Sequence, residues 1–405
     1  MTTTMLHAER LIDGTGRGAA RGLAILVEDG LIVEVGEREA LAARADRTLD
    51  MGDATVVPGF VDAHTHLTIR PGEGDQHGQL RQPHVWQALR AVRNLRAMVD
   101  SGVTTARIMG EQAGIDSIVK GLVEGGELVG PRLFVSRMAL SATHGHGAAL
   151  GTADGVDGVR RAVRENLRDG ADHIKIFMTG GVSSTGSDLF AYHYTRDEVR
   201  AIVEEAHRAG RRVAAHAHGG PGVTICAEEG VDSVEHGGLL TDENVEAMAR
   251  HGTWLVLTKT IGHHPAGIEQ GDAHRPEILA KLHQARAADA ASFERIRASG
   301  LRYALGTDSM HGLFGHELAW LAGRGVDPEA ALIAATRHGA EVIGIEGETG
   351  TLEAGKRADV TVLGGDYLAR PAEAVGDVRL VMKGGRVLVG PDAAAAPAPG
   401  RTLAV

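Results

Sequence analysis

The stretch Thr55-Val-Val-Pro-Gly-Phe-Val-Asp-Ala-His-Thr-His-Leu67 decides the fold of this chain. It predicts a buried strand that is entered through a Pro58-Gly59 turn and ends in two histidines. Side chains alternate between the two faces of a strand, so His64 and His66 project to the same side. Two such imidazoles make half of a metal site. One pair is a weak signal in a chain with 21 histidines, so the rest of the sequence must decide.

The composition is that of an ordinary soluble globular protein. The 405 residues are 43% hydrophobic and 23% charged, which suits one large domain with or without a small companion. A net charge of −11 without a basic stripe argues against nucleic acid as a partner. The single Cys226 excludes a disulfide framework and a cysteine-rich zinc site. No signal peptide or membrane span is apparent, so we expect a cytoplasmic protein without a membrane partner.

Both ends of the chain predict short strands. The apolar runs are 6–11, 22–27 and 31–35 near the N-terminus and 358–363, 378–382 and 387–389 near the C-terminus. Asp29-Gly30 between two of these runs is a strong hairpin signal. Neither end can bury a core alone, so we expect the two to pair into one small β-sandwich. The residues Asp392–Gly400 are typical of a loose tail.

Between the ends, apolar runs alternate with stretches of helical spacing. The runs are 56–62, 103–109, 132–140, 173–178, 212–216, 232–236, 253–258 and 302–307. The helical stretches include 86–99, 156–167, 196–209, 242–250, 278–298 and 328–343. This alternation predicts an α/β protein with a (β/α)₈ TIM barrel. The expected domains are the first part of the sandwich (1–57), the barrel (58–345) and the second part with the tail (346–405).

In a (β/α)₈ barrel, catalytic groups lie at the C-terminal ends of the strands. The polar residues at the predicted strand ends are His64, His66, Lys175, His216, His236 and Asp308. Taken singly, each has an ordinary explanation: a hydrogen-bonded core histidine, a lysine that reaches solvent or an aspartate that caps a helix. Together, at the end where this fold places its chemistry, they predict a metal site.

Lys175 stands inside an apolar strand, where an unpaired ammonium is costly. Burial lowers the pKa of a lysine, and a neutral amine can react with carbon dioxide to form a carbamate. The anionic carbamate could bridge two cations. A carboxylated Lys175 is therefore our hypothesis, and an unmodified lysine is the alternative.

The chain resembles the amidohydrolase superfamily over nearly its full length. The motifs that carry the resemblance are Pro58-Gly-Phe-Val-Asp-Ala-His-Thr-His66, Ile174-Lys-Ile176, Ala215-His216, Glu235-His236, Gly306-Thr-Asp308 and Gly350–Val360. Segments 136–147, 179–182 and 215–219 are similar to a subset with imidazolonepropionase-like proteins, Xaa-Pro and Xaa-Arg dipeptidases and ochratoxin-hydrolysing amidohydrolases.

The resemblance implies two divalent metal ions, with zinc the expected element. His64, His66 and Asp308 would hold one ion, and His216 and His236 the other. An N6-carboxylysine at Lys175 would bridge them. The implied reaction is hydrolysis by a metal-bridging hydroxide, with Asp308 transferring the proton to the leaving amine.

The resemblance also points to residues around the predicted metals. His146 matches a histidine that contacts the substrate carbonyl, whereas His144 stands where glycine is more usual. His218 faces the same side as His216 and stands where related dipeptidases often have a carboxylate-binding tyrosine. The further candidates for substrate contact are Arg70, Tyr192, Tyr194 and His311. We interpret His263-His264 as part of a loop that could act as a lid, because adjacent residues seldom chelate one ion.

The leading hypothesis is an enzyme that cleaves the amide C–N bond of a dipeptide or an N-acyl amino acid. The alternative is a hydrolase of carbamates, ureas or a cyclic amide with the same metal centre. A noncatalytic scaffold of this fold would have lost ligands, and here all six positions are filled. Arg70 or Arg137 with His218 could supply a carboxylate site. The expected partners are a small-molecule substrate and further copies of the chain in a homo-oligomer.

Overall fold

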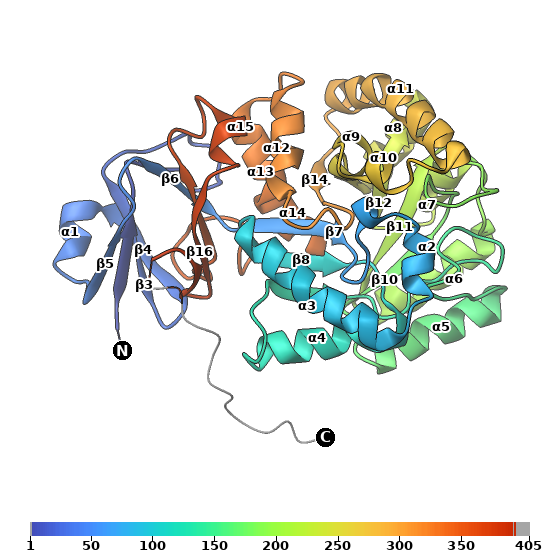
Figure 1. Cartoon of the computed structure of the whole chain (residues 1–405), viewed down its shortest axis with the longest axis horizontal. Helices are drawn as coiled ribbons and strands as arrows, with labels where there is room; N and C mark the ends of the chain where they lie inside the picture. The colour runs from blue at the N-terminus through green and yellow to red at the C-terminus, as the bar shows by residue number, and fades with distance from the viewer. Residues whose placement is uncertain (1, 392, 394–405) are drawn as a thin grey trace.

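The computed structural model describes residues 2–391 and 393, so the tail predicted at Asp392–Gly400 lies outside the described residues except for Ala393. Strands from the two ends of the chain lie together at one side, and the parallel strands and most helices form the larger body (Figure 1). The α/β class is as predicted.

The larger body is organised by eight parallel strands. They are β7 (Phe60–Thr65), β8 (Val103–Ile108), β9 (Arg132–Val135), β10 (His173–Phe177), β11 (Arg212–Gly219), β12 (Ser233–Leu239), β13 (Trp254–Leu257) and β14 (Tyr303–Leu305). Strands β7 to β9 pair in one sheet and β10 to β14 in another, each in chain order. A parallel bridge between Leu140 and Ile176 joins the two sheets. On the other side, the amide of Asp308 donates to the carbonyl of His64 at 2.9 Å.

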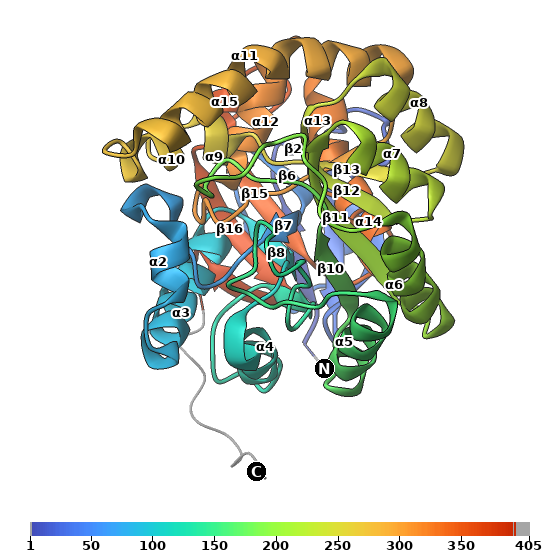
Figure 2. The same ribbon diagram turned by 90° about the vertical axis from the view of Figure 1, so that its right-hand side faces the viewer.

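Helices follow the parallel strands and surround them (Figure 2). They are α2 (Gln76–Leu80), α3 (His84–Asp100), α4 (Ile115–Glu124), α5 (Val156–Arg168), α6 (Arg196–Arg208), α7 (Pro221–Glu228), α8 (Asp242–His251), α9 (Thr260–His263), α10 (Ile268–Gly271), α11 (Pro276–Ser299), α12 (Phe314–Ala322), α13 (Pro328–Ala335) and α14 (Arg337–Ile343). Capping boxes begin two of them, with Thr195 opposite Glu198 in α6 and Thr241 opposite Asn244 in α8.

The two ends of the chain share two sheets and one apolar core. One sheet has the order β4 (Leu31–Glu37), β3 (Leu23–Glu28), β1 (Thr4–His7), β5 (Arg47–Asp50). The other has the order β17 (Arg386–Val389), β16 (Val378–Lys383), β15 (Val360–Gly364), β6 (Ala54–Pro58), β2 (Arg10–Leu11). The short helices α1 (Arg38–Ala42) and α15 (Pro371–Ala374) complete the ends. Leu6, Val56, Val360 and Leu380 pack in the common core, which joins both termini.

Several element boundaries differ from the predictions. The run 56–62 is two strands, because β6 pairs with the terminal strand β15 and only β7 joins the parallel strands. The run 6–11 is likewise divided into β1 and β2. The helix predicted over 328–343 breaks at Thr336, whose φ of −129° is not helical. The predicted lid loop holds the helical turn α9, so the loop interpretation of His263 was wrong.

Gly59 lies where the chain passes from β6 to β7, and a side chain there would overlap Thr104. A Cβ built at Gly59 meets Oγ1 and Cγ2 of Thr104 in β8. We therefore expect Gly59→Ala to lower the free energy of unfolding by about 2 kcal/mol, the cost of overpacking a tight site. Thermal unfolding would measure this change.

Two companion variants make that test specific. Thr104→Ala removes Oγ1 and Cγ2 but keeps the Thr104 Cβ, which lies 2.8 Å from the built atom, so it should restore only part of the stability of Gly59→Ala. Gly121→Ala adds a methyl group in α4 where no atom lies within 4 Å, and should be neutral or stabilising. Equal stability of Gly59→Ala and the wild type would contradict the packing argument.

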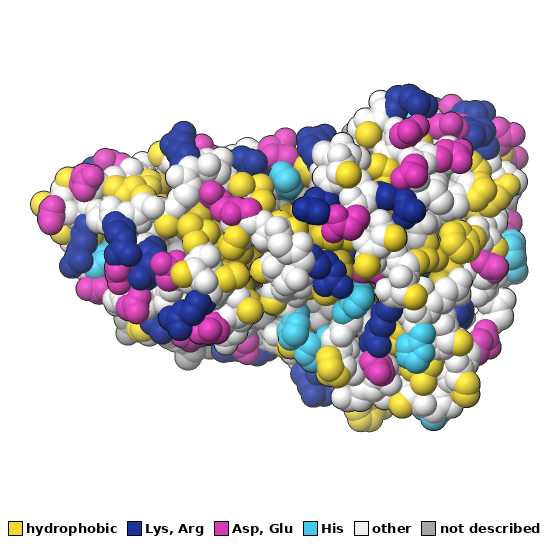
Figure 3. Space-filling model, turned by 90° about the horizontal axis from the view of Figure 1, so that it is seen from above, with side chains coloured by type: hydrophobic (Ala, Val, Ile, Leu, Met, Phe, Trp, Pro, Cys, Tyr) yellow, Lys and Arg dark blue, Asp and Glu magenta, His cyan; other side chains and the backbone are white. Residues whose placement is uncertain are grey.

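Acidic and basic side chains lie interspersed over the face seen in Figure 3. Among the described helices, none combines the length and apolar character needed to cross a bilayer.

Candidate metal centre

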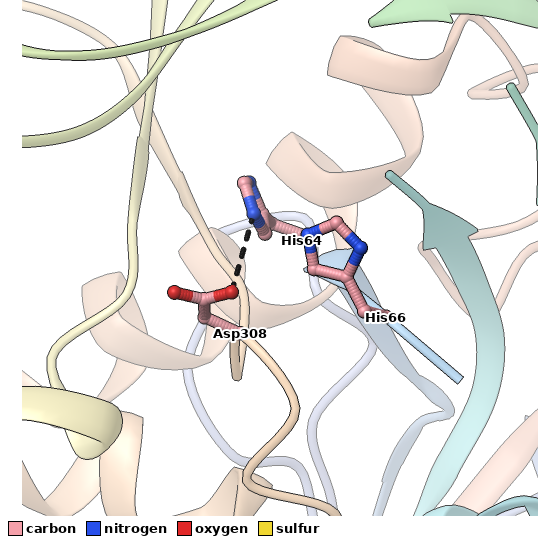
Figure 4. A group of neighbouring side chains, drawn as sticks. All are labelled: His64, His66 and Asp308. Atoms are coloured by element: carbon pink, nitrogen blue, oxygen red, sulfur yellow. Dashed lines mark ion pairs between the residues drawn. The ribbon is translucent and has the colours of Figure 1, made fainter. Parts of the chain in front are cut away.

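Three side chains converge where β7 and β14 end. His64 lies in β7, His66 follows it directly, and Asp308 comes three residues after β14. One ligand atom from each lies within 4.8 Å of the others, and His64 Nε2 lies 3.6 Å from Asp308 Oδ1 (Figure 4). Asp308 has a φ of 47°, a left-handed conformation that is uncommon outside glycine and often marks functional sites.

The other three predicted ligands line the same cavity. These are Lys175 of β10, His216 of β11 and His236 of β12. The His236 ring lies 4.7 Å from the His64 ring and 4.6 Å from the His216 ring, measured between centroids. The structure therefore brings together all six residues that the sequence placed at strand ends. Their role as ligands stays a prediction.

Hydrogen bonds orient the imidazoles and leave one nitrogen of each ring for a metal. His66 Nδ1 donates to the Gly110 carbonyl at 3.0 Å, and His236 Nδ1 lies 2.7 Å from Thr258 Oγ1. His216 instead directs Nε2 to the Gly180 carbonyl at 3.2 Å, which leaves Nδ1. Such contacts are typical of metal-binding histidines, whose second nitrogen is held by a protein group.

The protonation states also suit a divalent cation. Burial lowers the pKa of His66 to about 3 and the pKa values of His216 and His236 well below the usual value, so these imidazoles are neutral. Burial acts to raise the pKa of Asp308, but its contact with His64 and the nearby His66 and Lys175 side chains hold it at about 2. Neutral imidazoles with an ionised carboxylate are a donor set that fits zinc.

Within the described part of the chain, Lys175 lies in this cavity without the hydrogen-bond partners that a buried ammonium normally has. It is fully buried, and Nζ has no hydrogen-bond partner among the described residues. Burial lowers its pKa to about 8, and Nζ lies over the ring of Phe177, 5.1 Å from its centroid. An unpartnered buried amine in a cavity with the other predicted ligands, one carboxylate and four imidazoles, fits a group that is converted to an anion.

The predicted substrate-contact residues are divided. His146 and His218 line the cavity, whereas Arg70, Tyr192, His144 and His311 are not among the described residues that line it. Arg70 pairs with Glu73 at 3.3 Å, and Tyr192 is 47% exposed. His144 stacks edge-on against His193, and His311 Nε2 contacts the carbonyl of the predicted ligand His66 at 2.9 Å.

Two other candidates from the sequence lie away from the cavity lining. The Tyr194 hydroxyl is buried and donates to the Ala153 carbonyl at 3.0 Å. Arg137 pairs with Asp169 at 3.4 Å, so it does not supply the carboxylate site that the sequence suggested.

Sequence reasoning missed Lys259 and Asp289, which form a polar cluster in the cavity lining with His263. Lys259 Nζ and His263 Nε2 both contact the Asp289 carboxylate, the latter at 3.0 Å. Lys259 follows β13 closely, so the strand-end rule could have found it. Asp289 lies in the middle of α11, where a single polar residue gives no signal.

A buried ion pair beneath the site was also missed. Glu235 accepts from Arg107 at 3.0 Å and from His64 Nδ1 at 2.7 Å, and its side chain is fully buried. Burial opposes the ionisation of Glu235, but Arg107 and His64 keep its pKa at about 2. Glu235 is therefore an anion that fixes the ring of His64.

Replacing Glu235 with glutamine should weaken both the fold and the metal site. The buried Arg107 would lose its counter-charge, which costs about 3 kcal/mol of unfolding free energy. Replacing the anion that accepts from His64 Nδ1 with a neutral amide should weaken this contact and lower zinc affinity by about 10- to 100-fold. Thermal unfolding and zinc titration would measure the two effects.

The matched control is Glu204→Gln, which removes a carboxylate paired with Arg160 at the surface. It should change stability by less than about 1 kcal/mol. An equal loss in both variants, or unchanged zinc affinity in Glu235→Gln, would contradict the orienting role of Glu235.

An α/β fold whose parallel strands direct imidazoles and a carboxylate into one cavity defines a class of hydrolytic enzymes. The chain belongs to the amidohydrolase family, whose model matches residues 55–388. The resemblance predicted from the motifs is thus confirmed, and the chain is a hydrolase of this family.

Named relatives span nearly the whole chain. Ochratoxinase from Aspergillus niger is 30% identical over 430 residues, which cover 96% of this chain and 87% of that protein. Imidazolonepropionase from Acidiphilium cryptum is 27% identical over 415 residues, covering 94% and 96%. The crystal structure of a prolidase complexed with N-methylphosphonate-L-proline matches with a TM-score of 0.88 and 30% identity, covering 96% and 100%.

Proposed function

We propose that this chain hydrolyses the amide C–N bond of a dipeptide or an N-acyl amino acid with two zinc ions. The observation that carries the proposal is the convergence of the six predicted ligands on one cavity. Relatives named ochratoxinase and prolidase support an amide substrate. The proposal includes a (β/α)₈ barrel formed by β7 to β14, with a sandwich built from both chain ends.

The residues divide into two ligand sets in this proposal. His64, His66 and Asp308 hold one ion, His216 and His236 hold the other, and carboxylated Lys175 joins the two sets. The ions supply Lewis acidity, which activates water and polarises a carbonyl. The ligand set is supported by the close approach of His64, His66 and Asp308.

Two side chains handle protons and charge. Asp308 accepts a proton from the attacking water on its carboxylate and passes it to the nitrogen of the leaving amine. His146 lines the cavity and donates from its ring to the oxygen of the scissile carbonyl, where negative charge develops.

Basic side chains in the cavity lining support recognition of an amino-acid carboxylate. His218 Nδ1 is buried without a partner among the described residues, and Lys259 and Arg286 line the same cavity. Ile261 and Leu282 provide an apolar surface beside them for a side chain.

One observation favours the alternative, a hydrolase of carbamates, ureas or a cyclic amide. The two basic side chains Lys259 and Arg286 are already paired with acids. Lys259 contacts Asp289, and Arg286 lies 2.7 Å from Glu269. An uncharged substrate could bind without disturbing either pair.

A substrate screen with zinc and bicarbonate distinguishes the two. Released amino acid from dipeptides and N-acyl amino acids, compared with the corresponding amides that lack the carboxylate, would establish the leading proposal. Turnover confined to carbamates, ureas or cyclic amides would favour the alternative. No turnover in any class with metal bound would overturn both.

A further inference from the structure

Ser184 connects two histidines that line the cavity but belong to different parts of the chain. It lies in the loop between β10 and α6, and its Oγ contacts His146 Nδ1 and lies 3.0 Å from His77 Nε2. His77 comes from α2, and His146 from the segment after β9. The three side chains form a continuous row of hydrogen-bonding groups.

The direction of these hydrogen bonds decides which nitrogen of His146 carries a proton. A neutral imidazole has one N–H, and the contact made by one nitrogen fixes the state of the other. If His77 Nε2 donates to Ser184, the serine hydroxyl can donate to His146 Nδ1. The proton of His146 then resides on Nε2, which has no hydrogen-bond partner in the described part of the chain.

The ring of His146 is packed so that its orientation depends on this row. Phe177 lies edge-on at 5.3 Å and His216 at 4.6 Å, measured between ring centroids. A side chain at Gly181 would overlap the Nε2 edge of His146, so the loop backbone lies directly against the ring. Packing alone does not choose between Nδ1–H and Nε2–H, because the two tautomers have the same shape.

Helix α11 holds the loop that carries Ser184. Lys281 Nζ donates to the carbonyl of Ser184 and, at 3.2 Å, to that of Gly181. Glu277 accepts from the amide of Gly186 in the same loop. Residues from one helix thus anchor the loop backbone on both sides of Ser184, which fixes its hydroxyl beside His146.

We propose that His77 and Ser184 are positioning residues that hold His146 as the Nε2–H tautomer, ready to donate to the substrate carbonyl oxygen. This inference rests on the proposed function, because it assumes the role given there to His146. It adds that hydrolysis requires a hydroxyl group at position 184 and a hydrogen-bond donor at position 77.

Kinetics of four variants test the proposal with the substrate found in the screen. Ser184→Ala and His77→Leu should lower kcat by about 10- to 100-fold with little change in KM, as loss of an orienting partner does. Ser184→Thr keeps the hydroxyl, and His77→Gln places an amide donor near the former Nε2, so both should retain most of the wild-type kcat. The zinc content of all four should match the wild type.

Ser187→Ala is the matched control, since among the described residues its hydroxyl bonds within the loop, to the carbonyls of Gly181 at 3.2 Å and Ser184 at 3.4 Å. If loosening of the loop caused the effect, this variant would lose as much kcat as Ser184→Ala. That outcome, or a wild-type kcat in both Ser184→Ala and His77→Leu, would overturn the proposal.

A second readout does not depend on turnover. Nitrogen-15 NMR of the zinc-loaded protein, with the His146 signals assigned from a His146→Asn variant, should show the Nε2–H tautomer in the wild type and a mixture in Ser184→Ala. An unchanged tautomer in Ser184→Ala would overturn the inference. If the wild type showed no turnover, the proposed function would fail. The NMR measurement would still show whether Ser184 fixes the tautomer of His146.

Discussion

Asp308→Asn is expected to lower kcat by about 10³-fold, because it removes the group that would accept and return the proton of the attacking water. Asparagine has nearly the same size and also tolerates the left-handed backbone found here, where φ is 47°. The fold should therefore persist, and the loss should appear in kcat and in the metal content. Steady-state kinetics with elemental analysis of the purified variant would measure both.

Asp327→Asn provides the matched control for this change. Asp327 caps α13 by accepting from the amide of Ala330 at 3.1 Å, and asparagine caps a helix equally well. Activity and stability should both stay at the wild-type level. If Asp308→Asn kept its activity within a factor of about 10 of the wild type, the proton-transfer role would be refuted.

The pattern of the chain was sufficient to predict the α/β class and the convergence of the six strand-end residues. In a parallel arrangement, the carboxyl ends of the strands meet at one edge, so sequence position translates directly into location. His64 and His236, far apart in sequence, illustrate this with rings 4.7 Å apart.

Groups held by loops and helices were harder to predict. Asp289 lines the cavity from the middle of a long helix, and Ser184 contacts two histidines of the cavity from an irregular loop that Lys281 holds. Arg70 was predicted to contact substrate but pairs locally with Glu73 instead. Side-chain partners of this kind depend on tertiary packing, to which no period in the sequence corresponds.

Local breaks in regular structure also escaped prediction. The apolar run through Pro58-Gly59 reads as one strand, yet β6 and β7 pair with different neighbours on either side of Gly59. The helical spacing of 328–343 continues across Thr336, although the backbone does not. Periodicity reports which faces are buried, and a chain can keep a buried face while it changes direction.

Lys175→Met is expected to abolish activity while stabilising the metal-free protein. Methionine fills the space of the lysine stem without the unpartnered buried amine, so the metal-free fold should gain about 1 kcal/mol or more. Loss of the bridging group should also remove several kcal/mol of metal-dependent stabilisation of the transition state, which would lower kcat by about 10³-fold. Thermal unfolding after chelation would measure the gain in stability, and kinetics after zinc loading would measure the loss of activity.

Lys259→Met gives the contrast that makes this prediction specific to Lys175. Lys259 is also a buried lysine of the cavity, but its amine contacts Asp289, so its loss removes the lysine counter-charge and leaves His263 beside the Asp289 carboxylate, which should destabilise the fold. Carbon-13 NMR after incubation with labelled bicarbonate should show a carbamate signal in the wild type and in Lys259→Met, but not in Lys175→Met. Because a lysine that stayed an ammonium would give no such signal, its absence from the zinc-loaded wild type would refute carboxylation even if Lys175→Met were inactive.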